Sequence, residues 1–474
     1  MSATSRLIVV SNRAPVEMVR GPDGVRAVRT VGGLAGALDD ALRARGGLWI
    51  AWIGGQAADE LPAGTAGLPY PIRAVRLKER EVNNYYAGFA NQGLWPLCHA
   101  FPSRCRFQAN YWAAYRQANE RFAAAVQAAT QPRDLVWVHD FHLCLVPGLL
   151  RAAGVPASVG VFWHIPFPPP TVFGVCRWRA ELLTGLLGAD LIGFQTEPDV
   201  RNFLESVRQF LPHPVSDAPA RVHLSGRDVG VFAHPIGIDY ERFRAHGGDG
   251  MVQRKAARLR ATLGAETVIL GVDRLDYTKG ILERLRGYER FLERRPEWRR
   301  RACLVQITVP SRDRLPDYRD MKRSIDEEVG HITGRFTTEG RTPLQYLYAA
   351  LSRDQLAAYY AASDIALVTP LRDGMNLVAK EYVACRGGAA QDGVLVLSEF
   401  AGAAQELREA VVVNPYDAEA ICRGLEVAVG MQIDERRRRM RALDRRISNR
   451  DLTWWTQTFL TRLAEAGPPA ASAA

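Results

Sequence analysis

The sequence predicts an α/β protein built from two parallel-sheet domains. Its 474 residues exceed what one hydrophobic core ordinarily organises, so two domains of roughly 200 residues each are expected. Apolar strand-like runs recur along the chain, and most are followed by polar residues and a helix-like stretch. This alternation starts again at Val252, which places a linker between the domains at residues 239–250.

The composition is typical of a soluble globular protein, with 47% hydrophobic and 24% charged residues. No apolar run approaches the roughly 18 residues that a membrane span needs. The first residues carry no secretory signal, so a cytoplasmic protein without membrane partners is expected. Seven scattered cysteines, without CxxC or Cys/His spacing, favour reduced thiols and argue against a zinc site.

A formal charge of +10 suggests that the chain binds either nucleic acid or phosphorylated small molecules. Much of this charge falls in two arginine-rich, helix-like stretches, residues 294–301 and 436–446, which more often form solvated faces. No aromatic platform or recognisable nucleic-acid motif accompanies them. Phosphorylated small molecules are therefore the expected partners, and nucleic acid is not.

The first domain begins with a strand run at residues 6–11, and Arg13 follows at its carboxyl end. Parallel sheets bind ligands at the carboxyl ends of their strands, so Arg13 is a candidate binding residue. A hairpin-like interlude leads to Gly32 and Gly33, which precede a helix-like run at residues 34–45. Their backbone N–H groups could donate to an anion, although glycine pairs also form plain turns.

Residues 82–96 are rich in aromatic and amide side chains, a mixture that packs against sugar rings and binds their hydroxyl groups. We interpret Phe89 as a buried packing residue. Tyr86 and Trp95 are candidate ligand contacts.

Two further strand runs, residues 135–140 and 159–166, each end in polar residues. Asp140 and His164 are therefore expected to lie together at the carboxyl edge of the first sheet. A lone histidine is more often a core residue, but two polar residues at neighbouring strand ends favour a site. The strand run at residues 229–238 closes the first domain.

In the second domain, the strand run at residues 267–271 leads into a turn that carries Arg274 and Lys279. A helix-like run follows at residues 281–294. Two cations in a strand-turn-helix unit can converge on a diphosphate at the amino end of the helix.

Residues 364–381 read as an apolar strand, a charged turn and a helix that opens at Asn376. The turn holds Asp373 and Gly374, and the glycine lets the backbone approach a ligand closely. Glu381 lies about a turn and a half into the helix, where a carboxylate can accept two ribose hydroxyls. Taken alone, this stretch also fits an ordinary βα turn with a capping Asp and a solvated Glu.

Nine motifs, in order, resemble those of trehalose-6-phosphate synthases, which are retaining glycosyltransferases of family 20 with GT-B architecture. They are SNRAP, GGL, YYxxFxNxxLWP, VHDFHL, HIPFP, IGFQT, DRLDYTKG, TPLRDGMNLVAKE and SEFAGAAQEL. The resemblance runs from Leu7 to about Phe459. It implies two Rossmann-like parallel-sheet domains that face each other across a cleft. Residues 1–238 would form the acceptor domain, residues 239–452 the nucleotide-sugar donor domain, and residues 453–474 a helix returning to the first domain with a disordered tail.

The resemblance also implies roles for individual residues. The residues that match the family's acceptor-binding positions are Arg13, Tyr86, Trp95, Asp140 and Arg312. Those that match its donor-binding positions are Gly32, Gly33, Arg274, Lys279, Leu351, Asp373, Gly374, Met375, Asn376, Leu377, Val378 and Glu381. The expected catalytic set is His164, Asp373, Arg274 and Lys279.

The implied chemistry needs neither a metal nor a cofactor. Arg274 and Lys279 would stabilise the departing diphosphate, as oxyanion donors do elsewhere, and no DxD-type metal motif is evident. The family's mechanism is front-face attack, in which the leaving phosphate oxygen takes the acceptor proton. His164 and Asp373 would orient the sugar and stabilise positive charge at its anomeric carbon. A double displacement with Asp373 as nucleophile stays open.

The leading function is glucose transfer from UDP-glucose, or another nucleotide-glucose, to glucose 6-phosphate, with a separate phosphatase acting on the product. A glucosylglycerol-phosphate synthase, with glycerol 3-phosphate as acceptor, is the close alternative, and Tyr86 and Trp95 favour the hexose. A non-catalytic sugar-phosphate sensor is the other alternative. The donor base (uridine, adenosine or guanosine), a homo-oligomeric state and domain closure stay open.

Overall fold

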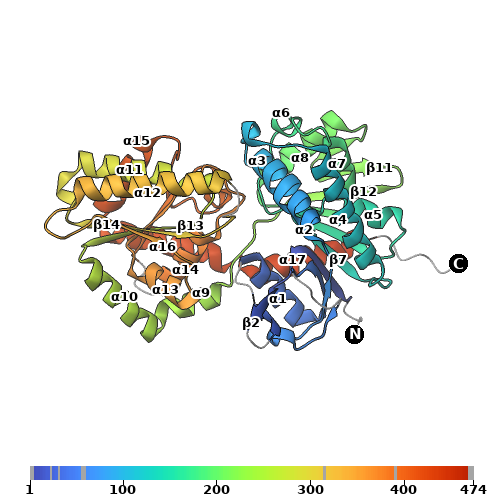
Figure 1. Cartoon of the computed structure of the whole chain (residues 1–474), viewed down its shortest axis with the longest axis horizontal. Coiled ribbons are helices and arrows are strands. Elements are labelled where there is room, and N and C mark those ends of the chain that lie inside the picture. Colours follow the sequence, from blue (N-terminus) through green and yellow to red (C-terminus); the bar gives the residue numbers. More distant parts are fainter. Residues whose placement is uncertain are drawn as a thin grey trace. The chain divides into compact units, whose positions relative to one another are not determined.

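The computed structural model describes residues 5–21, 24–29, 33–54, 60–312, 316–388 and 392–467. The chain divides into two compact units, Met1–Pro235 with Thr453–Ala474, and Ile236–Leu452 (Figure 1). Each unit holds its own mainly parallel sheet with helices packed on it. The predicted α/β class with two Rossmann-like sheets is confirmed.

Ten strands form the sheet of the first unit, in the order β10-β11-β12-β9-β8-β7-β1-β4-β6-β5. From β12 to β6 neighbouring strands are parallel, and the edge strands β5, β10 and β11 pair antiparallel. The bounds are β1 Leu7–Arg13, β4 Gly47–Trp52, β5 Glu60–Leu61, β6 Ile72–Ala74, β7 Leu135–His139, β8 Ser158–Phe162, β9 Leu191–Phe194, β10 Val215–Asp217, β11 Ala220–Leu224 and β12 Arg227–Ala233. The strand order reverses between β1 and β7, and such switch points are where doubly wound sheets bind ligands.

The predicted hairpin-like interlude is a separate antiparallel pair, β2 (Val16–Gly21) and β3 (Gly24–Arg29). The helices of the first unit are α1 Gly33–Arg45, α2 Glu79–Val82, α3 Trp95–Cys98, α4 Ala109–Gln127, α5 Val146–Ala152, α6 Pro170–Phe173, α7 Arg179–Leu186, α8 Glu197–Phe210 and, from Thr453 on, α17 Leu452–Ala466. Between α2 and α3 the chain forms a π-helix, Asn83–Leu94.

The C-terminal helix α17 packs on the sheet of the first unit (Figure 1). Its Phe459 ring stacks on Trp137 of β7, with ring centroids 4.6 Å apart. A Cβ atom at Gly160 of β8 would lie 2.9 Å from that ring, so the glycine is what lets the helix approach. The helix therefore packs on the first domain, as expected for residues 453–474. The tail expected to be disordered, residues 468–474, lies outside the described part.

The second unit has a six-stranded sheet in the order β15-β14-β13-β16-β17-β18, with every neighbouring pair parallel. Numbered along the chain, this is the 3-2-1-4-5-6 order of a Rossmann sheet, whose switch point lies between β13 and β16. The bounds are β13 Thr267–Arg274, β14 Ala302–Val309, β15 Leu344–Tyr348, β16 Ile365–Val368, β17 Val394–Ser398 and β18 Val411–Val413. These strands are mostly buried, as a sheet covered on both faces requires.

Helices cover both faces of this second sheet. Figure 1 shows α11 (Ile281–Arg294), α12 (Pro316–Phe336) and α15 (Ala418–Gly430) on one side, and α9 (Tyr240–Gly248), α10 (Gly250–Leu263) and α13 (Arg353–Ala362) on the other. The remaining helices of this unit are α14 Leu377–Gly388 and α16 Ile433–Ser448.

The linker predicted at residues 239–250 is wrong, because most of these residues form α9. Asp239 caps this helix by accepting the N–H of Arg242 at 3.3 Å. Gly247 lies directly against the carbonyl of Cys385 in α14, where a side chain would clash. Gly247 therefore permits the close packing of α9 against α14.

Candidate active site

Three of the predicted residues lie at the carboxyl ends of strands at, or next to, the switch point of the first sheet. Arg13 is the last residue of β1, and Asp140 directly follows β7. His164 lies two residues beyond the end of β8. The expectation that Asp140 and His164 lie together is met, because the backbone N–H of His164 donates to Oδ1 of Asp140 at 3.3 Å.

Arg13 is an exposed guanidinium placed between two aromatic rings. Its Cζ lies 5.1 Å from the ring centroid of Trp52 and 5.1 Å from that of Tyr86. Cation–π attraction of this kind orients a guanidinium without using its N–H donors. Trp52, the last residue of β4, was not predicted; it lies beside Arg13 because β4 and β1 are neighbouring strands in the sheet.

Tyr86 belongs to the π-helix, a conformation that often marks functional sites. Two side-chain amides meet carbonyls five residues earlier: Asn91 donates to Tyr86 at 2.7 Å, and Gln92 donates to Ala87 at 3.0 Å. The ring of Tyr86 also stacks on His142, with centroids 5.7 Å apart. The predicted tyrosine is thus held from two sides.

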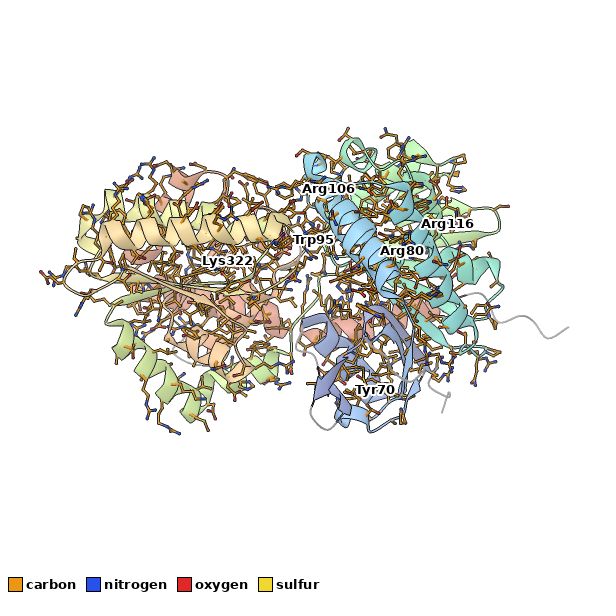
Figure 2. All side chains as sticks on the ribbon, viewed as in Figure 1. Tyr70, Arg80, Trp95, Arg106, Arg116 and Lys322 are labelled. Carbon is orange, nitrogen blue, oxygen red and sulfur yellow. The ribbon has the colours of Figure 1, made fainter. Side chains whose placement is uncertain are left out.

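Trp95, labelled in Figure 2, is only 6% exposed. Its ring lies 4.1 Å from that of His99 and 6.0 Å from that of Phe141, measured between centroids. This side chain is mainly a packing residue in the structure, so the ligand contact expected of it is confined to the small part of the ring that remains accessible.

Asp140 adopts a strained backbone, with φ 72° and ψ 171°. Residues other than glycine rarely occupy this region, and such strain clusters at functional sites. The N–H of Asp140 donates to the carbonyl of Phe162 at 2.8 Å, which holds the turn in place. Oδ2 of its carboxylate lies 4.0 Å from Nδ1 of His142.

His164 is half-buried, and burial lowers its pKa from 6.5 to about 3. The imidazole is therefore neutral at neutral pH, so it can act through hydrogen bonds rather than through charge. Its Nε2 lies 3.1 Å from Nδ1 of His139, the last residue of β7.

In the second unit, Lys279 and Asp373 meet at the switch point. Nζ of Lys279 lies 2.6 Å from Oδ2 of Asp373, and Nδ2 of Asn376 donates to the same oxygen at 3.1 Å. Lys279 ends the short 3₁₀ turn before α11, and Asp373 lies in the turn between β16 and α14. The sequence placed the two residues in separate βα turns, and the fold joins them.

The amino end of α14 presents backbone N–H groups of the kind that bind anions at helix ends. Asn376, at φ 84°, caps the helix by accepting the N–H of Ala379 at 3.1 Å. The helix itself provides no acceptor for the N–H groups of Leu377 and Val378 in its first turn. Gly374 and Met375, just before the cap, are buried.

Glu381 is half-buried on α14 and accepts the hydroxyl of Tyr360, on α13, at 2.8 Å. Burial raises its pKa, and the Tyr360 hydrogen bond acts in the opposite direction. Leu351, half-buried, comes directly before Ser352, the residue that caps α13. Leu351, the predicted base contact, therefore lies at the start of α13, and Tyr360 of the same helix positions Glu381.

Arg312 belongs to the second unit, whereas the other four expected acceptor residues belong to the first. Its Nη1 lies 2.9 Å from Oδ2 of Asp276 and 2.5 Å from the hydroxyl of Tyr318. Burial raises the pKa of Asp276, but the charges of Arg312 and Arg274 outweigh this and lower the pKa below its usual value. Asp276, which the sequence reasoning missed, thus lies within the field of both cations.

A buried ion pair supports this end of the second sheet. Arg284 of α11 is fully buried and pairs with Asp273 of β13. It also donates to Gln306 of β14 at 2.9 Å and to Thr369, just after β16, at 3.0 Å. One side chain therefore ties three neighbouring strands together beneath the Lys279–Asp373 pair.

The structure does not show the predicted Gly32–Gly33 pair as a whole. Gly32 lies outside the described residues, and Gly33 is the first residue of α1.

Over the described ranges, no three His, Cys, Asp or Glu side chains group closely enough to hold a metal ion. None of the described helices is both long and apolar enough to cross a membrane.

A cavity of about 780 Å³ lies elsewhere in the first unit, at the amino ends of β9 and β12. Two of its arginines already have partners. Arg151 pairs with Asp190 at 2.5 Å and donates to the carbonyl of Gly188, and Arg227 donates to the carbonyl of Ala189 at 2.8 Å. These contacts fasten the loop before β9, so we assign them a structural role.

The two Rossmann-like units, each with polar side chains gathered at its switch point, match solved glycosyltransferases of the GT-B type. Residues 5–465 match the sequence profile of Glycosyltransferase family 20. The chain belongs to this family, and it is a glycosyltransferase.

Similar proteins span nearly the whole chain. Trehalose-6-phosphate synthase of Mycolicibacterium smegmatis is 43% identical over 476 residues, covering 98% of this chain and 94% of that protein. A Burkholderia xenovorans α,α-trehalose-phosphate synthase (UDP-forming), solved in complex with glucose-6-phosphate, has a TM-score of 0.88 at 35% identity, covering 97% of this chain and 100% of that one. An E. coli structure bound with UDP-2-fluoro glucose has a TM-score of 0.88 at 36% identity, covering 97% and 99%.

Proposed function

We propose that the protein is a retaining glucosyltransferase that moves glucose from a nucleotide-glucose, with UDP-glucose preferred, to glucose 6-phosphate. The products are α,α-trehalose 6-phosphate and the nucleoside diphosphate. The observation that carries the proposal is the Lys279–Asp373 pair beside the amino end of α14, at the switch point of the second Rossmann sheet. The relatives named as trehalose-6-phosphate synthases, and the neighbours solved with glucose-6-phosphate and UDP-2-fluoro glucose, support the choice of substrates.

The second unit would bind the donor. Arg274, exposed at the end of β13, and Lys279 neutralise the diphosphate, and the N–H groups of Leu377 and Val378 complete its surroundings. Glu381, held by Tyr360, accepts the ribose hydroxyls. Leu351 would contact the base, and the backbone of Gly374, Met375 and Asn376 would contact the glucose. The family resemblance assigns Gly32 and Gly33, in the first part of the chain, to the donor phosphates.

The first unit would bind most of the acceptor. Arg13, oriented by Trp52 and Tyr86, binds the phosphate of glucose 6-phosphate with its N–H donors. Asp140 accepts sugar hydroxyls, and Trp95 contributes apolar contact. Arg312 adds a second cation for the acceptor phosphate.

Transfer proceeds on one face of the donor sugar. The acceptor hydroxyl attacks the anomeric carbon while the bond to the diphosphate breaks, and a phosphate oxygen of the leaving group takes the hydroxyl proton. Arg274 and Lys279 stabilise the charge that develops on the leaving group without a metal ion. His164 is neutral and hydrogen-bonds the sugar. Asp373 supports positive charge near the anomeric carbon, and its engagement with Lys279 and Asn376 favours this role over that of a nucleophile.

The test is nucleoside diphosphate release from UDP-, ADP- and GDP-glucose, each with glucose 6-phosphate or glycerol 3-phosphate, with products identified by mass and anomeric configuration by NMR. Release with glucose 6-phosphate alone supports the proposal and names the donor. Release with glycerol 3-phosphate alone moves the protein to that acceptor, and no release with any pair favours a sensor. Unchanged turnover in EDTA is expected, and a strict metal requirement would contradict the metal-free charge stabilisation.

A further inference from the structure

His139 is a buried histidine that the proposed mechanism does not use. It is 1% exposed, and its ring packs 4.6 Å from Trp137 and 5.4 Å from His164, measured between centroids. Its Nδ1 lies 3.1 Å from Nε2 of His164. Burial lowers the pKa of both histidines, that of His139 well below 6.5, so the pair is neutral and shares one N–H.

Two arrangements of that hydrogen bond are possible. If Nε2–H of His164 donates, His139 carries its own proton on Nε2. That nitrogen is buried and has no hydrogen-bond partner among the described residues, so the arrangement leaves a buried N–H unsatisfied. If Nδ1–H of His139 donates, its Nε2 is a bare lone pair. Buried N–H groups without any hydrogen-bond partner are rare in proteins.

The surroundings of His139 favour the second arrangement. The indoles of Trp137 and Trp455 flank it, with Trp455 6.4 Å away between centroids. Their Nε1 atoms are donors only, and neither has a hydrogen-bond partner in the described part of the chain. A protonated Nε2 on His139 would add a third unsatisfied donor to this aromatic cluster, whereas a lone pair there does not.

We propose that His139 is a positioning residue, whose Nδ1–H donates to Nε2 of His164 and holds His164 in the tautomer protonated on Nδ1. His164 then offers Nδ1–H as a hydrogen-bond donor. The catalytic consequence rests on the proposed function, because it assigns that N–H to the transferred sugar. The tautomer itself is a property of the free protein.

The decisive experiment is a long-range ¹H–¹⁵N NMR spectrum of the full chain labelled with ¹⁵N-histidine at pH 7.5. The His164 signals are assigned by their loss in His164→Gln. We expect a protonated Nδ1 and an unprotonated Nε2 on His164. The reverse pattern, or a charged ring, overturns the proposal, and this result holds whether or not the proposed substrates turn over.

Two variants add a kinetic readout. His139→Asn keeps an amide donor near the position of Nδ1, and His139→Leu removes it. We expect His139→Leu to lower kcat by about 10- to 100-fold, a loss of the size seen when the group that orients a metal-binding histidine is removed. KM for both substrates should change little, and His139→Asn should recover most of kcat.

Equal losses in the two variants would overturn the positioning role. His223→Leu, on β11, is the matched control, because the His223 side chain is 41% exposed, and it should leave both kcat and the His164 signals unchanged. If His139→Leu does not fold, the wild-type spectrum and the His139→Asn kinetics still decide the question.

Discussion

Nζ of Lys279 and Oδ2 of Asp373 lie 2.6 Å apart, in a pair whose side chains are only 13% and 14% exposed. The two residues come from turns after the neighbouring strands β13 and β16, so the pair exists only because the strand order reverses there. It places a cation and a carboxylate beside the amino end of α14.

Lys279→Ala should abolish most turnover while the protein stays folded. The lysine would stabilise charge on the leaving diphosphate, and removing one such donor typically costs about 10²- to 10³-fold in kcat. The measurement is steady-state kcat with a thermal unfolding curve. Lys322→Ala is the matched control, because Lys322 pairs with Asp326 at 2.6 Å on α12, where Figure 2 labels it. Near-normal turnover in Lys279→Ala would reject the assignment.

Arg13→Ala should raise KM for glucose 6-phosphate by about 10- to 100-fold, which corresponds to the roughly 1.5–3 kcal/mol of a charge-assisted hydrogen bond. KM for the donor should stay nearly constant. Arg13→Lys should restore little, because lysine lacks the planar group that stacks between Trp52 and Tyr86. Arg116→Ala, on the exposed face of α4, serves as control. A rise in the KM for the nucleotide-glucose, with the KM for glucose 6-phosphate unchanged, would contradict the assignment of Arg13 to the acceptor.

Stability should fall as the pH is lowered from about 6.5 towards 3. Burial lowers the pKa of His164 to about 3, so the unfolded chain binds a proton in this window that the folded chain does not. His139 contributes in the same direction. Between pH 7.5 and pH 5, the urea concentration at the midpoint of unfolding should therefore fall more for the wild type than for His164→Gln. An equal drop in both proteins would contradict a neutral, buried His164.

Gly160→Val should destabilise the first unit by about 1–3 kcal/mol, the usual cost of an overpacked core. A Cβ at this position would press on the ring of Phe459, so α17 must move away from the sheet. Gly330→Ala is a control with the opposite expected sign: it lies in α12 with open space around it, and should stabilise by about 0.5–1 kcal/mol. Urea unfolding measures the stability of both variants. If the free energy of unfolding of Gly160→Val equals that of the wild type, the contact between Gly160 and Phe459 is not tight.

The sequence alone determined the fold class and which residues end the parallel strands. Apolar runs followed by polar residues identify strands and their carboxyl ends, because a strand buried on both faces must be apolar until it leaves the sheet. Arg13, Asp140 and His164 were found in this way. Arg274 was expected in the turn after a strand at residues 267–271, whereas it is the last residue of β13. A helix was expected to open at Asn376, and the structure shows that Asn376, rather than the Asp considered in the alternative interpretation of this turn, is the residue that caps it.

Only the tertiary structure decided which of these residues meet. Trp52 beside Arg13, His139 behind His164 and Tyr360 on Glu381 are contacts between elements distant in sequence, and local patterns carry no signal for them. The same limit explains the wrong linker, since the glycine in α9 is required by α14, a neighbour far along the chain. Strand order and side-chain packing bring distant segments together. They therefore decide which of the residues predicted from the sequence lie in one site.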